Sequence, residues 1–585
     1  MACGRFDFDT LLTVLLFSVF GNFVCFNAYF VTATFDDDLK SYIQKSIADS
    51  IPLTTQRISF CHPPPSSNIQ ASVSGVNQVE PLAQQFNLYF FPDILFWDPL
   101  STIPSLKGVL QCPKEACKGR NSFLRAVGWK DGKTERSNPR RLYGLTAPVV
   151  LVSRVYRCQL NNHEVVAHDG HILIQLRNTD RPPFILSHLS GVTRDVQTAI
   201  SSYVLSELTF SRIANVMKQQ LWSSLAERCK TLSIHYPSIA NLSPSTLEQD
   251  IKSMWSTPSN DFIETIFLAE FWEKEKLYTL RMISEVGTDD WISMDHTFKV
   301  ACNIGIKRKS DNKWEKMFDS LFCVLNEKGQ VTGWQLTKGT SFENIRDLLQ
   351  RINSRCESKQ QQVKTCYIDN CCSWRGKLQS VFTSSCNVKL DLFHALSRVV
   401  TAMPKRHPFH VACSADFSKV FRHVDDSGPI RKKPTPTSEE ILKNLNQFEA
   451  KWKAVTFEDR PILTVKVLEE IRKLRKHISK GCLSDIPVGC GSERNENLHK
   501  WLRKAVHRNR LSVVLAVALF TTYFYAWNEK RLNGSDAVIP PIDCLINQLF
   551  HSSTCSSESF GVARSSFVSD QNLPRVLLEH DEQNP

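Results

Sequence analysis

The chain has 585 residues, of which 42% are hydrophobic and 22% are charged, and its formal net charge is +12. It is long enough to bury several cores, so we expect about two to four folded domains. Its 19 cysteines are odd in number and scattered, which argues against a disulfide-rich secreted protein, because such chains are shorter and more regularly spaced. Reduced thiols with a few metal ligands among them are the better interpretation.

The apolar run over 11–31 has about the length of a membrane span. The residues before it include one Arg and two Asp, so the positive region of a signal peptide is missing, and no small-x-small cleavage site stands out. Three interpretations stay open for residues 1–35: an anchor or signal segment, a buried strand or helix pair, and a misassigned first exon. Membrane association through this run is not favoured. Residues 36–84 are rich in Pro and Ser and are expected to form a linker.

A small zinc-ribbon-like module is predicted over 85–185. Cys112 and Cys117 are separated by four residues, and so are Cys158 and His163, with strand-forming residues before the second pair. Four such ligands suit tetrahedral Zn²⁺ and leave no open coordination position, so the module would position DNA or a partner rather than react. His168 or His171 is an alternative to His163, and the competing interpretation is an unliganded surface loop with incidental thiols.

A helical domain is predicted over 186–285. Its apolar residues recur at helical spacing, with a break near Leu208 and Thr209 that would join two helices. An all-α packing domain is favoured over a DNA-binding helix-turn-helix, because no recognition residues can be identified.

The following segments alternate between strand and helix. A strand-like run leads to Asp295, and two apolar runs turning at 326–329 form a hairpin. A helix follows, introduced by a capping-box pattern of Thr340 and Glu343. A strand ending at Asp369, an amphipathic segment and a further strand complete the series. This order of three strands, helix, strand, helix and strand is that of the ribonuclease H fold, in which the first and fourth strands are neighbours.

Neighbouring first and fourth strands would bring Asp295 and Asp369 together, where two carboxylates repel unless a cation lies between them. Mg²⁺ or Mn²⁺ is the expected cofactor, because hard divalent ions take oxygen ligands and a pair of them can clamp both oxygens of a phosphodiester displacement. Glu496, at a helix start, is the third predicted catalytic and metal-binding acid, and Glu493 is the competing choice one turn earlier. Asp289, Asp290, Asp391 and the nearby His394 rank lower. An isolated Asp at a strand end is more often a turn or a cap.

Residues from about Ile263 to Asn528 resemble the catalytic region of eukaryotic cut-and-paste transposases with a DDE triad, most closely the Mutator-like superfamily and its relatives. The motifs that carry the resemblance are "WISMDHTFKVACN", "IDNCCSWRGKLQSVF" and "RNENLHKWLRK". The choice of Glu496 rests on this resemblance, through Asn495 beside it. The resemblance implies an α/β fold with a ribonuclease H-like mixed sheet, divided into a first part over 286–395, a helical insertion over 396–488 and a last part over 489–545.

For function, the resemblance implies a transposon-derived nuclear protein that cuts and joins DNA by two-metal-ion in-line attack. It further implies a homo-oligomer on transposon ends. The alternative from another class is a domesticated, catalytically silent DNA- or chromatin-binding protein that keeps the fold.

Charge supports a nucleic-acid partner by a separate route. Residues 396–510 contain 24 Lys and Arg against 13 Asp and Glu, which is a net +11 of the +12 of the whole chain. Clustered cations neutralise phosphates and gain affinity through counterion release, whereas the competing interpretation is a solvated helix face. The predicted nucleic-acid-binding residues are Arg431, Lys432, Lys433, Arg472, Lys473, Arg475, Lys476, Arg503, Lys504, Arg508 and Arg510.

Three further expectations concern smaller features. Cys371 and Cys372, directly after the second acid, are interpreted as buried small residues rather than catalysts. The apolar run over 511–527 contains two Thr and is shorter than a membrane span, so it is expected to form a core helix that covers the sheet. The polar segment over 546–585 is expected to be disordered.

Overall fold

The computed structural model describes residues 39–41, 43–44, 47, 60–61, 90–117, 120, 122–130, 139–176, 182–187, 190–235, 254–272, 283, 286–308, 311–423, 433–506 and 510–533. The chain divides into two compact units, Met1–Lys276 with Lys504–His507 and Leu277–Arg503 with Arg508–Pro585. The predicted apolar segment over 11–31 and the predicted tail over 546–585 lie outside the described residues.

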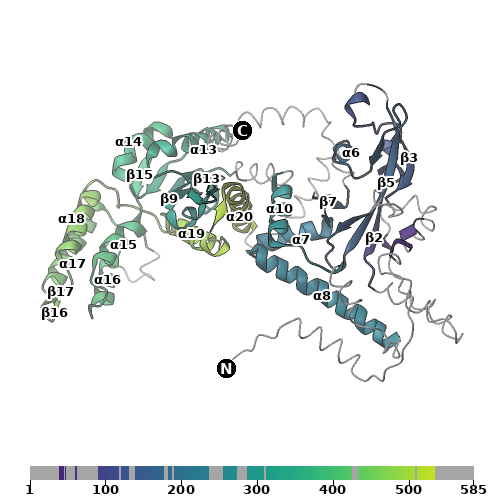
Figure 1. Ribbon diagram of the computed structural model, residues 1–585. Coiled ribbons are helices and arrows are strands. Elements are labelled where there is room, and N and C mark those ends of the chain that lie inside the picture. The colour runs from purple at the N-terminus through teal and green to yellow at the C-terminus, as the bar shows by residue number, and fades with distance from the viewer. Residues whose placement is uncertain are drawn as a thin grey trace, which may run out of the picture. The chain divides into compact units, whose positions relative to one another are not determined.

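The first unit is built on a six-stranded mixed sheet rather than a small ribbon (Figure 1). Its long strand β5 (Val149–Cys158) runs parallel to β2 (Asp93–Trp97) and antiparallel to β3 (Leu124–Trp129), β4 (Arg140–Leu142) and β6 (Glu164–Val166), while β1 (Phe60–Cys61) pairs with β2. Successive residues of β5 alternate between two apolar clusters, Val150 and Val152 in one and Leu151 in the other. Because side chains alternate across a strand, both faces of the sheet are covered.

The remaining elements of this unit are short or helical. The predicted pair of helices is present as α7 (Arg194–Leu205) and α8 (Phe210–His235), and the break between them includes Glu207 at a φ of +64°. A third helix, α10 (Asn260–Glu270), packs against both. The short elements are α5 (Pro99–Thr102), η1 (Pro104–Leu106), η2 (Glu115–Cys117), α6 (Gly170–Leu173), β7 (Phe184–Leu186) and β8 (Gly191–Thr193).

The second unit contains a five-stranded mixed sheet in the order β13-β12-β9-β14-β15. The strands are β9 (Trp291–Thr297), β12 (Ser320–Asn326), β13 (Val331–Thr337), β14 (Thr365–Ile368) and β15 (Asn387–Leu390). β12 is antiparallel to β9 and β13, whereas β14 is parallel to β9 and β15. The prediction that the strand before Asp295 and the strand before Asp369 are neighbours is therefore confirmed.

The β12–β13 hairpin turns where the sequence predicts. Asn326 accepts a hydrogen bond from the Gly329 backbone N–H at 2.8 Å through its carbonyl oxygen, and its side-chain oxygen accepts from Lys328 and Gln330. Gly329 has a φ of +76°, a conformation that glycine adopts without steric cost. The register of the two strands is thus fixed by the turn.

Between β9 and β12 the chain makes a small insertion. It consists of α12 (Phe298–Ala301) and the antiparallel pair β10 (Ile304–Lys307) and β11 (Trp314–Lys316). β18 (Leu511–Ser512) joins β10 in parallel and leads directly into α20 (Val513–Asn533). Through the pairing of β18 with β10, this second sheet links the start of α20 to the segment that follows β9, the strand that contains Asp295.

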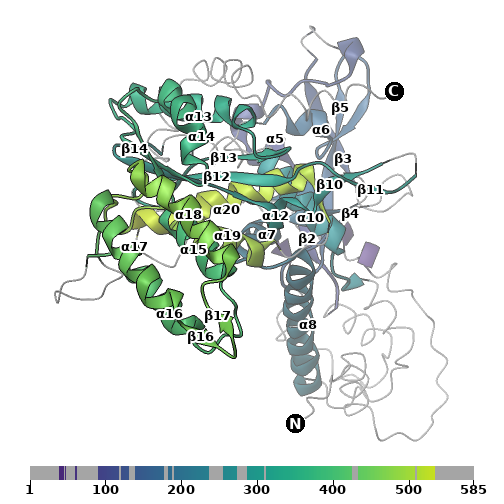
Figure 2. The same cartoon turned by 90° about the vertical axis from the view of Figure 1, so that its left-hand side faces the viewer.

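Helices cover both faces of the five-stranded sheet. Figure 2 shows α13 (Arg346–Ser358) and α14 (Cys371–Val381) on one side of it, and α19 (Glu493–Ala505) and α20 on the other. α20 contains the apolar run predicted to be a core helix, and Phe520 and Phe524 within it are fully buried. Among the described residues, no helix is long and apolar enough to cross a membrane.

The predicted capping box before α13 is wrong. Phe342–Asn344 forms a 3₁₀ turn preceded by Ser341, and α13 begins only at Arg346. Neither start has a side-chain capping hydrogen bond. Phe342 is instead buried against Trp374, with ring centroids 5.4 Å apart. Tertiary packing rather than local capping therefore determines how the chain enters α13.

The insertion between the second and third acids is helical, as predicted. It contains α15 (Leu392–Ala402), α16 (His410–Lys419), α17 (Ser438–Lys453) and α18 (Val465–Ser479), with a small hairpin of β16 (Thr456–Phe457) and β17 (Arg460–Pro461). In Figure 1 these helices lie beyond the edge strand β15. Leu390 of β15, Ile441 of α17 and Ile478 of α18 belong to one apolar cluster. The insertion and the sheet therefore share one core.

We expect Ile292→Ala to lower the free energy of unfolding by about 2–5 kcal/mol, because Ile292 lies fully buried in the central strand β9 and the substitution leaves a cavity. Urea denaturation followed by tryptophan fluorescence measures this effect. Ile306→Ala is the matched control, since Ile306 is 40% exposed on β10. Equal losses in the two variants would contradict the assigned core.

Candidate functional site

The first two acids come from neighbouring parallel strands, since Asp295 lies within β9 and Asp369 directly follows β14. Ser293 of β9 is in register with Tyr367 of β14. Asp295 and Asp369 come two positions after these residues, so extending the same register places the two acids side by side. The Asp295 side chain is 12% exposed and that of Asp369 is 35% exposed. The pair therefore lies at the carboxyl end of the central strands, open to solvent mainly on the Asp369 side.

The third acid is held in place by its neighbour Asn495, which is fully buried. The Ser293 hydroxyl donates to Asn495 Oδ1 at 2.6 Å, and Asn495 Nδ2 donates to the Cys323 carbonyl oxygen at 3.3 Å. These bonds fix the first turn of α19 against β9 and β12, with Glu496 as the next residue. Glu496 groups with Asp295 and His499, with one ligand atom of each within 4.8 Å of the others. Glu493 is exposed, so the geometry favours Glu496.

A single imidazole lies among all the acids. His394 of α15 has its Nε2 3.3 Å from Glu496 Oε1 and 3.9 Å from Asp295 Oδ2. Its Nδ1 is 2.7 Å from Asp391 Oδ2 and 3.7 Å from Asp369 Oδ1. One helical turn later, Arg398 Nη2 lies 3.0 Å from Asp369 Oδ2. Two cationic side chains of α15 therefore balance part of the negative charge of the site.

Asp391 ranked low among the acids as a polar residue at the edge of the sheet. It is a buried structural anchor whose side chain is 1% exposed. It caps α15 by accepting from the His394 backbone N–H at 2.9 Å, and it accepts from the Ser492 N–H at 2.7 Å. Gly491 before Ser492 has a φ of +123°, and a Cβ there would lie 2.9 Å from Asp391 Oδ1. Asp391 thus ties the start of α15 to the loop that leads into α19.

The charges of the site are strongly coupled. Burial raises the pKa of Asp295 to about 7, with His394 opposing this rise and Glu496 and Asp369 adding to it. Burial alone would lower the pKa of His394, but its hydrogen bonds to Asp391 and Glu496 and the charges of the other acids raise it to about 11. The hydrogen bond from His394 lowers the pKa of Glu496. His394 is therefore an imidazolium at neutral pH, and Asp295 is the acid that most needs a further cation in order to ionise.

One carboxylate oxygen and one ring nitrogen of the site residues lack a hydrogen bond. Asp369 Oδ1 and His499 Nε2 are buried and have no hydrogen-bond partner among the described residues. Burial lowers the pKa of His499 to about 4, so its neutral ring can act as a ligand. Carboxylate oxygens are the donors that Mg²⁺ and Mn²⁺ prefer. Asp295 and Glu496 offer two of them beside His499, within 4.8 Å of one another, whereas Asp369 lies outside this group. The donor set therefore fits a divalent cation.

His499 was not singled out from the sequence. It follows Glu496 by three residues, and residues three apart lie on one helix face. Its Nδ1 is 3.6 Å from Asp295 Oδ2. The spacing was the signal that could have identified it.

Three of the four predicted zinc ligands come together in the first unit. Cys112, Cys117 and Cys158 are buried with their sulfur atoms within 4.8 Å of one another. His163 is exposed and does not belong to the group. Its contact with Cys158 is through the backbone, where the His163 carbonyl oxygen accepts from the Cys158 N–H at 2.8 Å. His168 Nδ1 instead contacts the Ser153 hydroxyl at 2.7 Å. The donor set is three thiols, with the Asn161 amide donating to Cys117 Sγ at 3.0 Å.

The predicted nucleic-acid-binding residues differ in their surroundings. Lys433 is 5% exposed and so is not available to DNA, and Arg475 is engaged with Glu449 at 2.6 Å and Asn446 at 2.7 Å. The residues exposed to solvent are Arg472, Lys473, Lys476, Arg503, Lys504 and Arg510. Arg431, Lys432 and Arg508 lie outside the described residues.

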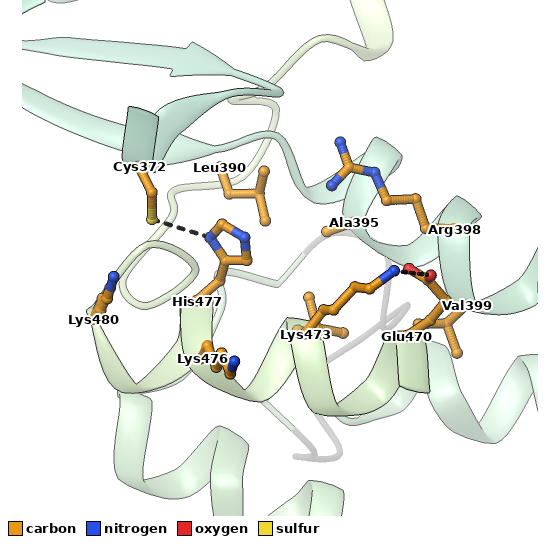
Figure 3. A pocket seen from close by; sticks show the side chains of 11 residues that line it. Cys372, Leu390, Ala395, Arg398, Val399, Glu470, Lys473, Lys476, His477 and Lys480 are labelled. Atoms are coloured by element: carbon orange, nitrogen blue, oxygen red, sulfur yellow. Dashed lines mark hydrogen bonds and ion pairs between the residues drawn. The ribbon is translucent and has the colours of Figure 1, made fainter. Parts of the chain in front are cut away.

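A basic pocket lies next to the acids. It has a volume of about 280 Å³ between α15, α18 and the start of α14 (Figure 3). Lys473, Lys476 and Lys480 line it from α18 and its end, and Arg398, the partner of Asp369, lines it from α15. Lys480 and Arg398 were not among the residues predicted to bind nucleic acid. Of the four cations that line the pocket, Arg398 contacts the second acid and Lys473 pairs with Glu470, which also lines it, at 2.7 Å.

Comparisons with known proteins include a weak structural similarity. No protein-family model matches the chain, and no curated protein matches it. Among solved structures, a chain of the Drosophila P element transposase strand transfer complex matches 62% of this chain and 96% of its own length, at 11% sequence identity and a TM-score of 0.25. A TM-score of this size does not establish a shared fold.

We expect Asn495→Ala to destabilise the second unit by about 1–3 kcal/mol, because it leaves the buried Ser293 hydroxyl and Cys323 carbonyl without their partner. Asn497→Ala is the matched control, since Asn497 is exposed two residues further along the same helix. Urea denaturation of both variants provides the comparison. A loss of the same size in Asn497→Ala would refute the anchoring role.

Proposed function

We propose that the chain is a transposon-derived, DDE-type nuclease and strand transferase with a ribonuclease H-like core. The observation that carries the proposal is the convergence of Asp295, Asp369 and Glu496 around the His394 imidazolium. The strand order β13-β12-β9-β14-β15 supports it, since this is the ribonuclease H order when the β10–β11 insertion is set aside. The substrate class is DNA, and the reaction is in-line displacement at a phosphodiester.

The three acids would hold Mg²⁺ or Mn²⁺, with His499 as a further ligand candidate, since its Nδ1 lies 3.6 Å from Asp295 Oδ2. When bound, a pair of such ions supplies activation of the attacking water or 3′-hydroxyl and stabilisation of the leaving oxygen. No covalent intermediate on the enzyme is required.

The protein's own residues have distinct parts in this proposal. Asp391 and Ser492 hold the His394 ring from the side away from Glu496, because Asp391 Oδ2 and the Ser492 hydroxyl lie 2.7 and 3.1 Å from Nδ1. The imidazolium keeps Glu496 and Asp295 close together before any cation arrives. Such preorganisation limits the rearrangement that the reaction itself requires.

The basic pocket supports DNA as the partner. Its four cations come from α15 and the end of α18, so a phosphate backbone crossing the pocket would pass beside Asp369. Contacts of this kind position the nucleic acid without reading its sequence. A nuclear location and a homo-oligomer on paired DNA ends are parts of the same proposal, and the Cys112 group would hold Zn²⁺ to position DNA or a partner.

The second candidate function is a catalytically silent DNA- or chromatin-binding protein. The specific observation in its favour is that His394 and Arg398 already pair with the acids. A site balanced by its own side chains keeps its shape without a metal ion. Measurements of cutting and of binding on the same protein separate the two functions.

The first test is Mg²⁺- or Mn²⁺-dependent nicking and strand transfer on DNA that carries the flanking ends of the source locus. We expect Glu496→Gln to lower the rate by at least about 100-fold, the upper range for losing even an outer-shell partner of a metal. Glu493→Gln is the matched control, because it removes the same charge from an exposed position one turn earlier, and it should keep the wild-type rate. Wild-type protein that binds this DNA but never cuts it would leave the silent binding protein as the better assignment.

The second test concerns the pocket. Lys476→Ala should weaken binding to DNA of any sequence and lower the slope of log affinity against log salt by about 0.9, the value for one lost phosphate contact. Lys443→Ala removes one exposed charge from α17 outside the pocket and should leave the slope unchanged. Fluorescence anisotropy at several salt concentrations measures both. Identical slopes in the two variants would place the DNA elsewhere.

A further inference from the structure

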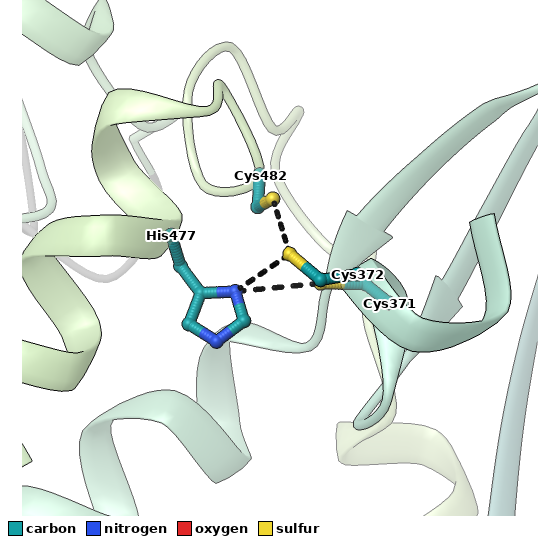
Figure 4. Close-up of side chains that lie close together, drawn as sticks. All are labelled: Cys371, Cys372, His477 and Cys482. Atoms are coloured by element: carbon teal, nitrogen blue, oxygen red, sulfur yellow. Dashed lines mark hydrogen bonds between the residues drawn. The ribbon is translucent and has the colours of Figure 1, made fainter.

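Four side chains that are soft or borderline metal ligands lie close together at the start of α14, the helix that follows the second acid. Cys371 and Cys372 begin α14, directly after Asp369 and Asn370, while His477 and Cys482 come from the end of α18 and the loop that follows. One ligand atom of each lies within 4.8 Å of all the others. Figure 4 shows the three sulfur atoms and the imidazole directed toward one common point. The interpretation of the two adjacent cysteines as buried small residues is wrong for Cys372, which is exposed.

The separations match the edges of a zinc tetrahedron. Zn–S and Zn–N bonds of ~2.3 and ~2.05 Å give edges of ~3.8 Å between two sulfurs and ~3.6 Å between sulfur and nitrogen. Cys372 Sγ lies 3.7 Å from Cys482 Sγ and 3.9 Å from Cys371 Sγ. His477 Nδ1 is 3.6 Å from Cys371 Sγ and 3.3 Å from Cys372 Sγ. These four of the six edges agree with the tetrahedron to within about 0.3 Å, and the two that join Cys482 to Cys371 and to His477 are shorter than 4.8 Å.

The backbone is built to return Cys482 to this point. α18 ends at Ser479, and Gly481 follows with a φ of +70°, the left-handed conformation that terminates many helices. The Cys482 N–H then donates to the His477 carbonyl oxygen at 3.0 Å, and the Cys482 carbonyl oxygen accepts from the Leu390 N–H at 2.9 Å. The loop is thereby fastened to the last residue of β15.

Two features of the surroundings place positive potential near the sulfur atoms. Cys371 and Cys372 occupy the first turn of α14, where the helix dipole stabilises negative charge. Arg375 Nη2 donates to Cys482 Sγ at 3.2 Å. Three thiolates with one Zn²⁺ carry a net charge of −1, which Arg375 offsets.

We propose that Cys371, Cys372, His477 and Cys482 form a structural Zn²⁺ site that fastens the helical insertion to the start of α14. On binding, each thiol releases its proton to solvent and all four positions of the ion are filled by protein, so the site does not react with substrate. It joins residues 105 positions apart in the chain. It also fixes one wall of the basic pocket, because Cys372 and His477 both line that pocket. The site is independent of the proposed reaction and is compatible with either function.

The test is the metal content of the full-length chain, purified under reducing conditions with zinc supplied and measured by inductively coupled plasma mass spectrometry. We expect Cys482→Ser and His477→Ala each to contain one zinc per chain less than the wild type. Cys413→Ser is the matched control, because Cys413 is a fully buried thiol of the same insertion outside any metal-ligand group found among the described residues. Cys117→Ser reports separately on the Cys112 group. Unchanged zinc content in both Cys482→Ser and His477→Ala would overturn the proposal.

A second measurement uses only the wild-type protein and so does not depend on the folding of a variant. Cys372 and Cys302 are both exposed, but only Cys372 would be a ligand. Iodoacetamide labelling with mass-spectrometric detection should find Cys372 protected in the zinc-loaded protein and at least tenfold more reactive after a zinc chelator is added, while Cys302 reacts equally in both states. Labelling of Cys372 that ignores the chelator would rule out the site. Neither measurement contains DNA, so failure here leaves the proposed nuclease activity untouched.

Discussion

Mutual repulsion of carboxylates is the constraint around which the second unit is organised. Parallel pairing of β9 and β14 brings Asp295 and Asp369 to one edge, and α19 adds Glu496. At short range and low solvent exposure such charges destabilise one another by several kcal/mol unless cations intervene. The insertion supplies two, His394 and Arg398, both from α15. Helix α15, which holds both cations, is thus as necessary to the site as the strands that hold the acids.

The anchors of the site are buried hydrogen bonds to amide and backbone groups. Asn495 connects α19 to both β9 and β12, and Asp391 connects the start of α15 to the loop before α19 through backbone N–H groups. Hydrogen bonds of this kind are directional and are fully desolvated here, so a loss leaves an unpaired buried group. They set the positions of Glu496 and His394, whose side chains lie 3.3 Å apart.

The elements that the sequence predicted well are those with strong local patterns. The β12–β13 hairpin follows from Asn326 and Gly329 at the turn, and the α7–α8 break and the apolar helix α20 follow from periodicity. The start of α13 did not follow from its local pattern, because burial of Phe342 against Trp374 overrides the capping residues.

The candidate site was predictable only in part. Asp295 lies within β9 and Asp369 directly follows β14. Each belongs to a motif that is visible in the chain, and their proximity follows from strand order. The role of Asp391 depends on the Ser492 N–H, which is 101 positions away. The grouping of Cys372 with His477 depends on a helix end 105 positions away. No spacing rule reaches that far, so thiols that look incidental along the chain become ligands only in three dimensions.

The bond between Ser293 and Asn495 spans 202 positions of the chain, and this has a consequence for the order in which the protein acquires its structure. During synthesis the strands through β15 and the whole insertion leave the ribosome before α19 exists. Contacts of such high sequence separation form slowly, since a long loop must close before they contribute. The carboxylate cluster is therefore completed late, and a nascent chain cannot present all three acids to nucleic acid until nearly all of the second unit has been made.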